Sequence, residues 1–439
     1  MTNTAPGTGE GYRAAVAGLR QTRLDSAYKG VPLGAALPLA EIGTRGWNVA
    51  RGDLALPVLT LDASALEANI DTMQRYCDAH GVRLAPHGKT TMSPQLFAAQ
   101  LDAGAWGITA ATPTQVALMR RHGIPRIVLA NELVERSALH WVAAELARDP
   151  GFEFLCLVDD VEAVRAMDAV LAEVSPARPL TVLIEIGDSG GRAGVRSPDV
   201  ACAVARAVRS AAHLRLGGVE AFEGVLAASA DDEAFARVDG LLASVRESVR
   251  RIAALDLFDR DELIVTAGGS MYFDRVIDAL GRWPEFDRPV SLVLRSGCYV
   301  SHDAGAYEQN SPLAGRRAPG QRFRLANALT LWATVLSRPE PDTLIVGAGL
   351  RDAPVDRDLP RPRSRFRGAA PAGEFADTAE TYRVMDQHMF IRVRPEADVL
   401  PGDVVSFDLS HPCTAFDKFP FIPLVDERFD VVDGVLTFF

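Results

Sequence analysis

The sequence predicts an α/β fold: a (β/α)8 barrel of the TIM type, followed by a smaller, mostly β C-terminal domain. Between about residues 57 and 300, short apolar runs alternate with segments of helical periodicity. The runs are continuously apolar, which is typical of parallel strands covered on both faces. After residue 300 the helical patterns give way to short strand-like runs separated by turn signals.

Apolar runs supply the candidate barrel strands, and about eight strand–helix units are what a closed barrel requires. Helical patterns separate the runs, such as 63–81 and 93–104, and the second ends on Gly104, a common C-cap residue. An open, doubly wound sheet is the alternative, but no glycine-rich dinucleotide fingerprint follows the first run. The candidate runs are PVLTLD (57–62), VRLAP (82–86), WGITAAT (106–112), RIVLAN (126–131), FEFLCLV (152–158), TVLIEIG (181–187), LRLGGVEAF (214–222), LIVTAGG (263–269) and SLVLRSG (291–297).

The rest of the chain sets the expected domain organisation. Segment 338–375 is rich in Pro, Arg, Gly and Asp and predicts loops around one strand, TLIVGAG (343–349). We expect an N-terminal extension, 1–50, which packs on the β domain and could add a strand to it. The barrel would span 51–305 and the β domain 306–439. Later strands are expected in HMFIRVRP (388–395), DVVSFDLSHP (403–412), FPFIPLVD (419–426) and VVDGVLTFF (431–439).

Composition limits the classes of function. The net charge of −11 and the isoelectric point near 5.3 argue against a general binder of nucleic acid or anionic membranes. No apolar stretch approaches the roughly 18 residues of a membrane span, and the N-terminus lacks a signal-peptide pattern. The five cysteines are odd in number and irregularly spaced, so a disulfide framework is not expected. We therefore expect a reduced, cytoplasmic protein.

Lys89 and His87 stand at the end of a predicted barrel strand, where barrels place functional residues. A lysine in a partly enclosed site can form a Schiff base and act as a base. The alternative is a solvated loop lysine or a phosphate contact. His87 lies two residues away and would share the same strand face.

Two glycine-containing loops follow late strands, TAGGSMY (266–272) and LRSGCYVSHD (294–303). Free backbone N–H groups in such loops can cradle an anion, and barrels often bind phosphate after their last strands. The pair indicates a phosphorylated cofactor, although either loop alone is more simply a tight turn. A third strand-end loop, IEIGDSGGRAGV (184–195), carries Arg192, which either points into the barrel mouth or lies on the surface.

His411 and Cys413 form a candidate metal pair in SHPCTAFDKF. Residues spaced by two along a strand point to one face, and imidazole with thiolate suits zinc. The alternative is that both are ordinary core residues, as buried histidine and cysteine often are. Asp408 and Asp417 are nearby polar candidates that we interpret as structural.

Taken together, these segments resemble one family. PHGKTTMSPQLFAAQLDAGAWGITAATPTQ (86–115) is similar to the cofactor-lysine segment of the D-serine dehydratase and D-threonine aldolase family. VTAGGS (265–270) and LRSGCYV (294–300) look like its phosphate loops, and GDVVSFDLSHPCTAFDKF (402–419) looks like its metal segment. These are pyridoxal-phosphate enzymes with an alanine-racemase-like barrel. The likeness runs from about residue 50 to the C-terminus, and GTRGWNVARGDLALP (43–57) resembles a bacterial amino-acid deaminase subgroup.

The resemblance implies a role for each matching residue. Lys89 would hold pyridoxal 5'-phosphate, and His411 with Cys413 would bind zinc. The aldolase branch more often pairs its histidine with aspartate and uses manganese, so Cys413 favours the dehydratase branch. Two departures concern substrate range: FEGVLA (222–227) lacks the family's usual histidine, and RSGCY replaces the commoner PGSY. The implied cofactor-binding residues are Lys89, His87, Arg192, Gly268, Gly269, Ser270, Gly297, Cys298 and Tyr299.

The expected reaction is β-elimination of the hydroxyl from a D-β-hydroxy amino acid such as D-serine, giving pyruvate and ammonia. One alternative is a metal-activated D-threonine-type aldolase, which yields glycine and an aldehyde. Another is a racemase, which needs a second base, with Tyr382 as the candidate. A non-enzymatic cofactor carrier is disfavoured by the C-terminal β domain. We expect a homodimer that binds a small D-amino acid; the arginine-rich stretch 351–367 has no assigned role.

Overall fold

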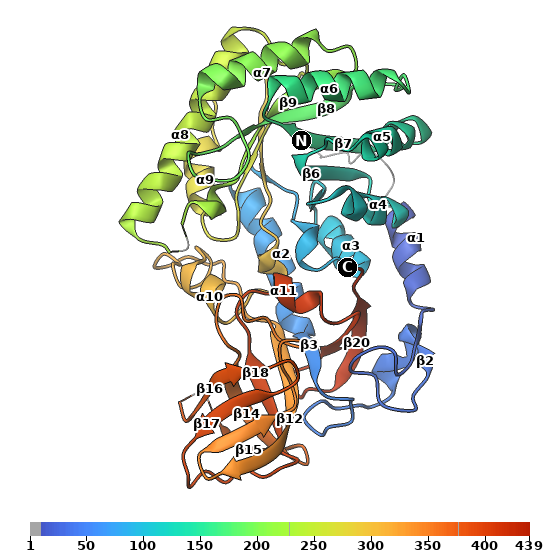
Figure 1. Ribbon diagram of the computed structural model, residues 1–439, viewed down its shortest axis with the longest axis vertical. Coiled ribbons are helices and arrows are strands. Elements are labelled where there is room, and N and C mark those ends of the chain that lie inside the picture. Colours follow the sequence, from blue (N-terminus) through green and yellow to red (C-terminus); the bar gives the residue numbers. More distant parts are fainter. Residues whose placement is uncertain (1–9, 228, 376) are drawn as a thin grey trace. The chain divides into compact units, whose positions relative to one another are not determined.

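The computed structural model describes residues 10–227, 229–375 and 377–439 (Figure 1). The chain forms two compact units and passes between them more than once. The barrel unit contains Gln74–Lys89 and Gln100–Gly297, with the segment that ends at Tyr12. The β unit contains Arg13–Met73, Thr90–Ala99 and Cys298–Phe439. In the described part of the chain, no helix combines the length and apolar character needed to cross a membrane.

Eight parallel strands form the sheet of the barrel unit, in the order β4-β11-β10-β9-β8-β7-β6-β5. His87 and Thr109 form a parallel bridge, and the Thr109 N–H donates to the Pro86 carbonyl at 2.8 Å. This bridge joins the continuation of β4 to β5 and closes the ring, which confirms the predicted TIM-type barrel. The strands are β4 (Arg83–Leu84), β5 (Ile108–Ala110), β6 (Arg126–Glu132), β7 (Glu153–Val158), β8 (Leu180–Ile186), β9 (Leu214–Ala221), β10 (Leu263–Ala267) and β11 (Val290–Leu294).

Helices follow the barrel strands, and α5 to α8 lie outside strands β6 to β9 (Figure 1). Several begin at a side chain that accepts a backbone N–H of the first turn; Thr112, Asp160, Ser197 and Asp231 are such N-caps. The helices of this region are α4 (Pro113–Arg121), α5 (Arg136–Arg148), α6 (Val161–Ala172), α7 (Pro198–Ser210), α8 (Asp232–Ala254) and α9 (Phe273–Leu280). Further helices are α1 (Glu10–Leu19), α2 (Ala63–Ala79), α3 (Pro94–Asp102), α10 (Ala306–Asn310) and α11 (Cys413–Phe416).

The β unit is built on a largely antiparallel sheet in the order β15-β14-β18-β12-β13-β17-β16. Strand β3 (Val58–Asp62) joins it by pairing with β12 and β19. The first of the nine apolar runs, PVLTLD, is therefore not a barrel strand, and that prediction is wrong. The other strands are β12 (Leu329–Glu340), β13 (Thr343–Val346), β14 (Arg361–Arg367), β15 (Ala370–Glu374), β16 (Ala379–Val384), β17 (Met389–Val393), β18 (Val404–Asp408), β19 (Phe421–Val425) and β20 (Val431–Leu436).

The arginine-rich segment is also more ordered than predicted. Residues 361–367, RPRSRFR, form β14 rather than a loop, and they pair with β15 and β18. Phe366 and Arg365 are buried in this strand, with 6% of each side chain exposed. A buried carboxylate, Asp403, compensates the guanidinium of Arg365 at 2.8 Å. The arginine-rich composition suggested an exposed loop, because an arginine is rarely buried unless a carboxylate pairs with it.

The N-terminal segment contributes to the core of the β unit. Leu24, Leu39 and Ile42 belong to one buried cluster with Trp332 and Phe421. Strands β1 (Arg23–Leu24) and β2 (Leu37–Pro38) pair with each other in a separate two-stranded sheet. The first strand of the chain that joins the larger sheet is β3. The proposed domain boundaries at residues 50 and 305 stay a prediction about independent folding.

Candidate active site

A cavity of about 120 Å³ opens among the strand ends of the barrel unit. Five of the predicted residues line it: His87, Lys89, Arg192, Gly268 and Gly269. The remaining lining residues are Ala111, Ala130, Asn131, Phe222 and Arg295. Ser270, Gly297, Cys298 and Tyr299 are not among the described residues that line this cavity, and their cofactor role stays a prediction.

Lys89 lies in a short 3₁₀ turn, Gly88–Thr90, directly after the β4 strand end. The neighbouring His87 donates its backbone N–H to the Arg295 carbonyl at 3.2 Å. Burial, together with the charges of Lys89 and Arg295, holds the pKa of His87 well below its usual value, so the imidazole is neutral at pH 7. Its Nδ1 is buried without a hydrogen-bond partner among the described residues. An unsatisfied buried nitrogen beside an amine fits a polar ligand in this cavity.

Arg295 is the residue that sequence reasoning missed. It directly precedes the Ser-Gly of the predicted second phosphate loop, and only 5% of its side chain is exposed. Its guanidinium donates to Thr266 Oγ1 at 2.8 Å, to the Ala221 carbonyl at 3.2 Å and to Glu220 Oε1. These three acceptors fix Arg295 as a rigid cation at the cavity wall. Its position at the end of an apolar strand could have predicted it as a site residue.

Three carboxyl groups lie at or near the C-terminal ends of strands β6, β8 and β9: Glu132, Glu185 and Glu220. Burial, then the charge of Glu220 and a hydrogen bond with Glu132, raises the pKa of Glu185 to about 9. Burial also raises the pKa of Glu220, although Arg295 opposes the shift. Arg192 contacts this group at its edge, with Nη2 4.0 Å from Glu185 Oε1. At neutral pH the group therefore retains protons and carries less negative charge than three free carboxylates.

The carboxyl group of Glu223 already occupies the first predicted phosphate loop, and burial raises the pKa of this group. The N–H of Gly269 donates to Glu223 Oε1 at 2.6 Å, and the N–H of Gly268 donates to Glu223 Oε2 at 3.2 Å. Gly268 has a φ of +98°, and a Cβ there would lie 2.7 Å from Leu294 Cδ2, so only glycine fits. The loop thus presents donors suited to a phosphate, but Glu223 must release them before a phosphate can use them.

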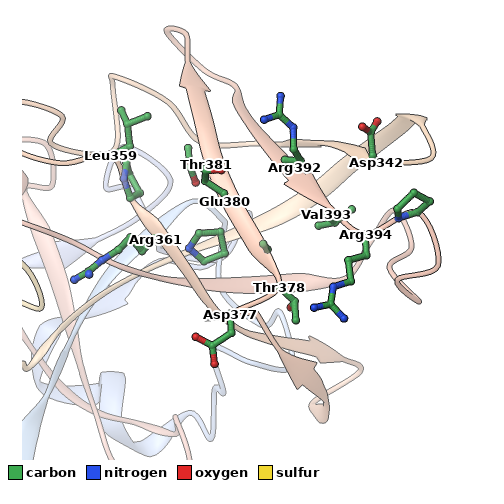
Figure 2. Close-up of a pocket in the computed structure, with 14 residues that line it drawn as sticks. Asp342, Leu359, Arg361, Asp377, Thr378, Glu380, Thr381, Arg392, Val393 and Arg394 are labelled. Carbon is green, nitrogen blue, oxygen red and sulfur yellow. The ribbon is translucent and has the colours of Figure 1, made fainter.

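A larger cavity, about 770 Å³, lies in the β unit beside β14, β16 and β17 (Figure 2). Its charged lining residues have both signs: Arg361, Arg392 and Arg394 against Asp342, Asp377 and Glu380. None of the predicted site residues lines it. Charges of both signs offer no net attraction for an anionic ligand, so we take the smaller cavity as the candidate active site.

His411 and Cys413 lie in the β unit, but not on a strand as predicted. Strand β18 ends at Asp408, His411 has a φ of +72°, and Cys413 begins the short helix α11. Pro412 explains the break, because a proline has no N–H for a sheet ladder and acts here as the N-cap residue. His411 and Cys413 therefore do not share one face of a strand, and that prediction is wrong.

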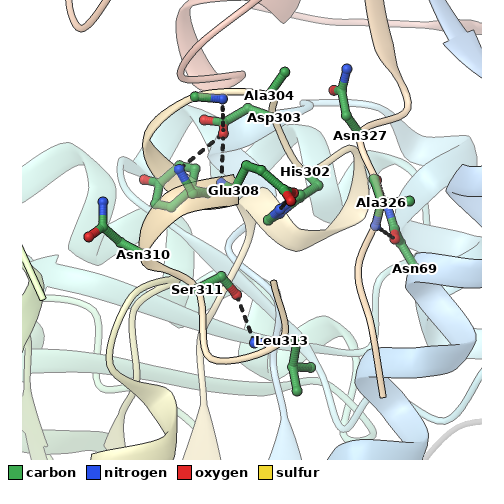
Figure 3. Close-up of polar contacts among 12 residues, drawn as sticks. Asn69, His302, Asp303, Ala304, Glu308, Asn310, Ser311, Leu313, Ala326 and Asn327 are labelled. Atoms are coloured by element: carbon green, nitrogen blue, oxygen red, sulfur yellow. Dashed lines mark hydrogen bonds and ion pairs between the residues drawn. The ribbon is translucent and has the colours of Figure 1, made fainter. Parts of the chain in front are cut away.

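Two aspartates fix His411. Asp356 accepts hydrogen bonds from His411 Nδ1 and, at 2.7 Å, from Thr414 Oγ1. Asp303 Oδ2 accepts the His411 backbone N–H at 2.8 Å. Asp303 Oδ1 accepts backbone N–H groups of its own turn, including that of Glu308 at 3.2 Å (Figure 3) and that of Tyr307 at 3.0 Å. A carboxylate on Nδ1 leaves Nε2 for a metal ion. Asp356 belongs to the 351–367 stretch, which had no assigned role.

The Cys413 sulfur lies 3.4 Å from Cys298 Sγ and 3.3 Å from Thr90 Oγ1. Across the residues that the structure describes, no group of three or more His, Cys, Asp or Glu gathers to hold a metal ion. Imidazole and thiolate nevertheless suit zinc chemically, and a pair of protein donors leaves positions for water and substrate. The donor set fits an open zinc site rather than a closed structural one.

Two family models match the chain. The model described as "Alanine racemase, N-terminal domain" matches residues 61–256, and "Putative serine dehydratase domain" matches residues 328–425. The chain belongs to the D-serine dehydratase and D-threonine aldolase family of fold type III pyridoxal-phosphate enzymes. This family comprises lyases of D-amino acids, and its members use pyridoxal phosphate.

The characterised relatives include both aldolases and dehydratases. D-threonine aldolase from Arthrobacter sp is 27% identical over 87% of this chain and 88% of that protein. D-threo-3-hydroxyaspartate dehydratase from Delftia sp. is 36% identical, but over 38% of this chain and 43% of that protein. Family membership therefore leaves two reactions to be distinguished.

Solved structures agree with the fold. D-threonine aldolase from Filomicrobium marinum matches with a TM-score of 0.73 and 25% identity, covering 89% of this chain and 96% of that chain. A cysteine-to-alanine mutant of D-threo-3-hydroxyaspartate dehydratase in the metal-free form matches with a TM-score of 0.66 and 25% identity, covering 89% and 99%.

Proposed function

We propose that this protein is a pyridoxal-phosphate- and zinc-dependent dehydratase of D-3-hydroxy amino acids, with D-serine as the first candidate substrate. The observation that carries the proposal is the donor pair: Cys413 supplies a thiol beside His411, whose Nδ1 is held by Asp356. Thiolate is a soft ligand that favours zinc over manganese. One solved structure of the related dehydratase is that of a cysteine-to-alanine mutant in a metal-free form. That structure supports a cysteine as a metal ligand in this chain.

Pyridoxal phosphate, when bound, supplies an electron sink for the carbanion at Cα. In this chain Lys89 would hold it, and the Lys89 Nζ, once free, would accept the Cα proton. His87 stays neutral and offers its unpartnered Nδ1 to a polar group in the cavity. Arg295 places a fixed positive charge on the cavity wall. The glycine loop would take the phosphate after Glu223 leaves its N–H groups.

Zinc, when bound, supplies a Lewis acid that makes hydroxide a tolerable leaving group. His411 Nε2 and Cys413 Sγ would hold it. Asp356 fixes the imidazole tautomer, and Asp303 fixes the backbone at His411, so both residues orient the pair without touching substrate. Without such activation, deprotonation at Cα alone would lead to racemisation.

The test measures products from one substrate that both reactions can use. With D-threonine, a dehydratase releases 2-oxobutanoate and ammonia, whereas an aldolase releases glycine and acetaldehyde. We expect ammonia and the 2-oxo acid, pyruvate from D-serine, with activity lost after chelation and restored by zinc. Cys413→Ala should lose zinc and at least about 100-fold in kcat/KM, whereas the control Cys202→Ala, in helix α7, should keep both. Glycine and aldehyde as the main products would overturn the dehydratase proposal.

The aldolase is the second candidate, because the D-threonine aldolase likeness extends over 87% of the chain. It would use the same residues with a base at the substrate hydroxyl. We set the racemase alternative aside because the relatives at this similarity are lyases. A homodimer and a cytoplasmic location stay predictions of the sequence.

A further inference from the structure

Two cysteines from distant parts of the chain approach each other in the β unit. Cys298 begins a short 3₁₀ turn, Cys298–Val300, and Cys413 begins helix α11. Their sulfur atoms are 3.4 Å apart, although 115 positions separate them in the sequence. A disulfide bond length is about 2.05 Å, so the two sulfurs lie within about 1.4 Å of bonding distance.

The surroundings favour reaction at this pair over the other cysteines. Cys413 is partly exposed, whereas Cys298 is buried, with 5% of the residue exposed. The Thr90 hydroxyl contacts both sulfurs, at 3.3 Å from Cys413 and 3.9 Å from Cys298, and can donate a hydrogen bond to a thiolate. The other thiols, Cys77, Cys156 and Cys202, are at most 3% exposed.

We propose that Cys298 and Cys413 form an oxidisable dithiol that a peroxide converts to a disulfide. The Cys413 thiolate attacks one peroxide oxygen; an S–O bond forms, the O–O bond breaks, and the leaving oxygen takes a proton. Cys298 then attacks the Cys413 sulfur; the S–S bond forms, the S–O bond breaks, and water leaves with the Cys298 proton. Both sulfurs are oxidised and the peroxide is reduced, so the electrons balance. A dithiol reductant reverses the step.

This inference deepens the proposed function and partly rests on it, because Cys413 is the proposed zinc thiolate. A sulfur in a disulfide cannot serve as that ligand, so oxidation would switch off zinc binding reversibly.

The experiment counts thiols and maps the bond in the full-length protein. The reduced, metal-free protein is treated with a small excess of hydrogen peroxide, denatured and titrated for thiols. The chain has five cysteines, so we expect the titre to fall from five to three and to recover with dithiothreitol. Peptide mass spectrometry should find the 298–413 peptides cross-linked, 2 Da lighter than the two free peptides together. The control Cys202→Ala should also lose two thiols, whereas Cys298→Ser should form no cross-link.

The outcomes separate this inference from the proposed function. If no 298–413 cross-link forms in the wild-type protein, the dithiol proposal is overturned, and zinc binding by Cys413→Ala decides the metal site independently. If the cross-link forms and added zinc slows it at least about tenfold, both ideas are supported, because a metal-bound thiolate is protected. If the cross-link forms at the same rate with zinc, the dithiol stands and the zinc role of Cys413 fails.

Discussion

Each unit contains a buried arginine paired with a buried carboxylate, and the two pairs behave oppositely. In the β unit, Arg365 and Asp403 pair at 2.8 Å, with 6% and 2% of their side chains exposed. In the barrel unit, Arg295 pairs with Glu220, with 5% and 0% exposed. Although burial acts against it, hydrogen bonds from Arg367, the Leu400 N–H and Arg365 lower the pKa of Asp403 to about 2. Burial instead raises the pKa of Glu220 despite its arginine.

The difference lies in how many donors serve each carboxylate. Asp403 receives two guanidinium groups and a backbone N–H, so its ionised form is fully compensated. Glu220 accepts a hydrogen bond from one guanidinium, that of Arg295, and the charge of Arg192 also favours its ionised form. The charges of Glu132 and Glu223 oppose ionisation, and Glu220 Oε2 has no partner among the described residues. A saturated pair stabilises a fold, whereas an undersupplied cluster can exchange protons and accept a ligand.

The largest expected effect is on stability in the β unit. Replacing Asp403→Ala leaves Arg365 buried without its carboxylate, and we expect a loss of about 3–5 kcal/mol in the free energy of unfolding. Denaturant titration of the wild type and the variant measures it. The control Asp398→Ala removes a carboxylate that is 73% exposed and contacts the same Arg367, and it should cost less than about 0.5 kcal/mol. Equal losses for the two variants would contradict the contrast.

The matched change in the barrel unit should cost less stability but damage the cofactor site. In Arg295→Met, Glu220 can take up a proton instead of remaining an uncompensated charge, so we expect a loss of about 1–3 kcal/mol. Affinity for pyridoxal phosphate should fall at least about tenfold, because the variant removes a fixed cation from the cavity. Denaturation and cofactor titration give the two values. A stability loss as large as that of Asp403→Ala would show that both pairs are structural.

The two carboxyl clusters should also respond to pH in opposite directions. The pKa of Glu185 rises from 4.5 to about 9 on folding, so the unfolded chain ionises first and stability falls as pH increases between these values. Glu185→Gln removes this loss of stability. The melting temperature of the variant should therefore increase relative to that of the wild type as pH rises from 5 to about 9. The exposed Glu67→Gln serves as the control, with no such trend expected. A pH-independent difference would contradict the assigned protonation.

Asp403 has the opposite sign. Its pKa falls from 3.8 to about 2 on folding, so its stabilisation is complete above 3.8 and is lost as pH decreases through 2. The stability difference between the wild type and Asp403→Asn should therefore shrink as pH drops below about 4. Acid titration of the folded fraction at several denaturant concentrations measures the difference. A stability difference that stays constant down to pH 2 would contradict the lowered pKa of Asp403 and the contrast between the two buried pairs.

The smallest effect is expected at Arg192. Its side chain is 52% exposed, and it contacts Glu185 only at 4.0 Å, with its guanidinium 5.1 Å from the Phe222 ring. Arg192→Ala should change the unfolding free energy by less than about 0.5 kcal/mol, and any change should appear in KM rather than kcat. Steady-state kinetics with D-serine and thermal melting test this. A large drop in kcat would show instead that Arg192 contributes to the chemical step.

The sequence by itself predicted the barrel strands and five strands of the β unit, β13 and β17 to β20, but not β12, β14, β15 or β16. It also identified five of the residues that line the barrel cavity, but not Arg295. Eight apolar runs became the eight barrel strands, because a continuous apolar run must be covered on both faces. His87, Lys89, Arg192, Gly268 and Gly269 line one cavity as expected from their places at strand ends. These features follow from local patterns and from the rule that barrels carry function at one end of their strands.

Only the tertiary structure decided which partners these residues have. The PVLTLD run is a short apolar run like those of the barrel strands, yet it pairs with β12, since period and composition do not specify a neighbour. The same limit hid the carboxylate that makes Arg365 a core residue, the Glu223 side chain on the glycine loop, and the approach of Cys298 to Cys413. Each of these features depends on a contact between residues that are distant in the sequence. Such contacts do not produce a periodic pattern of residue types, so sequence patterns cannot predict them.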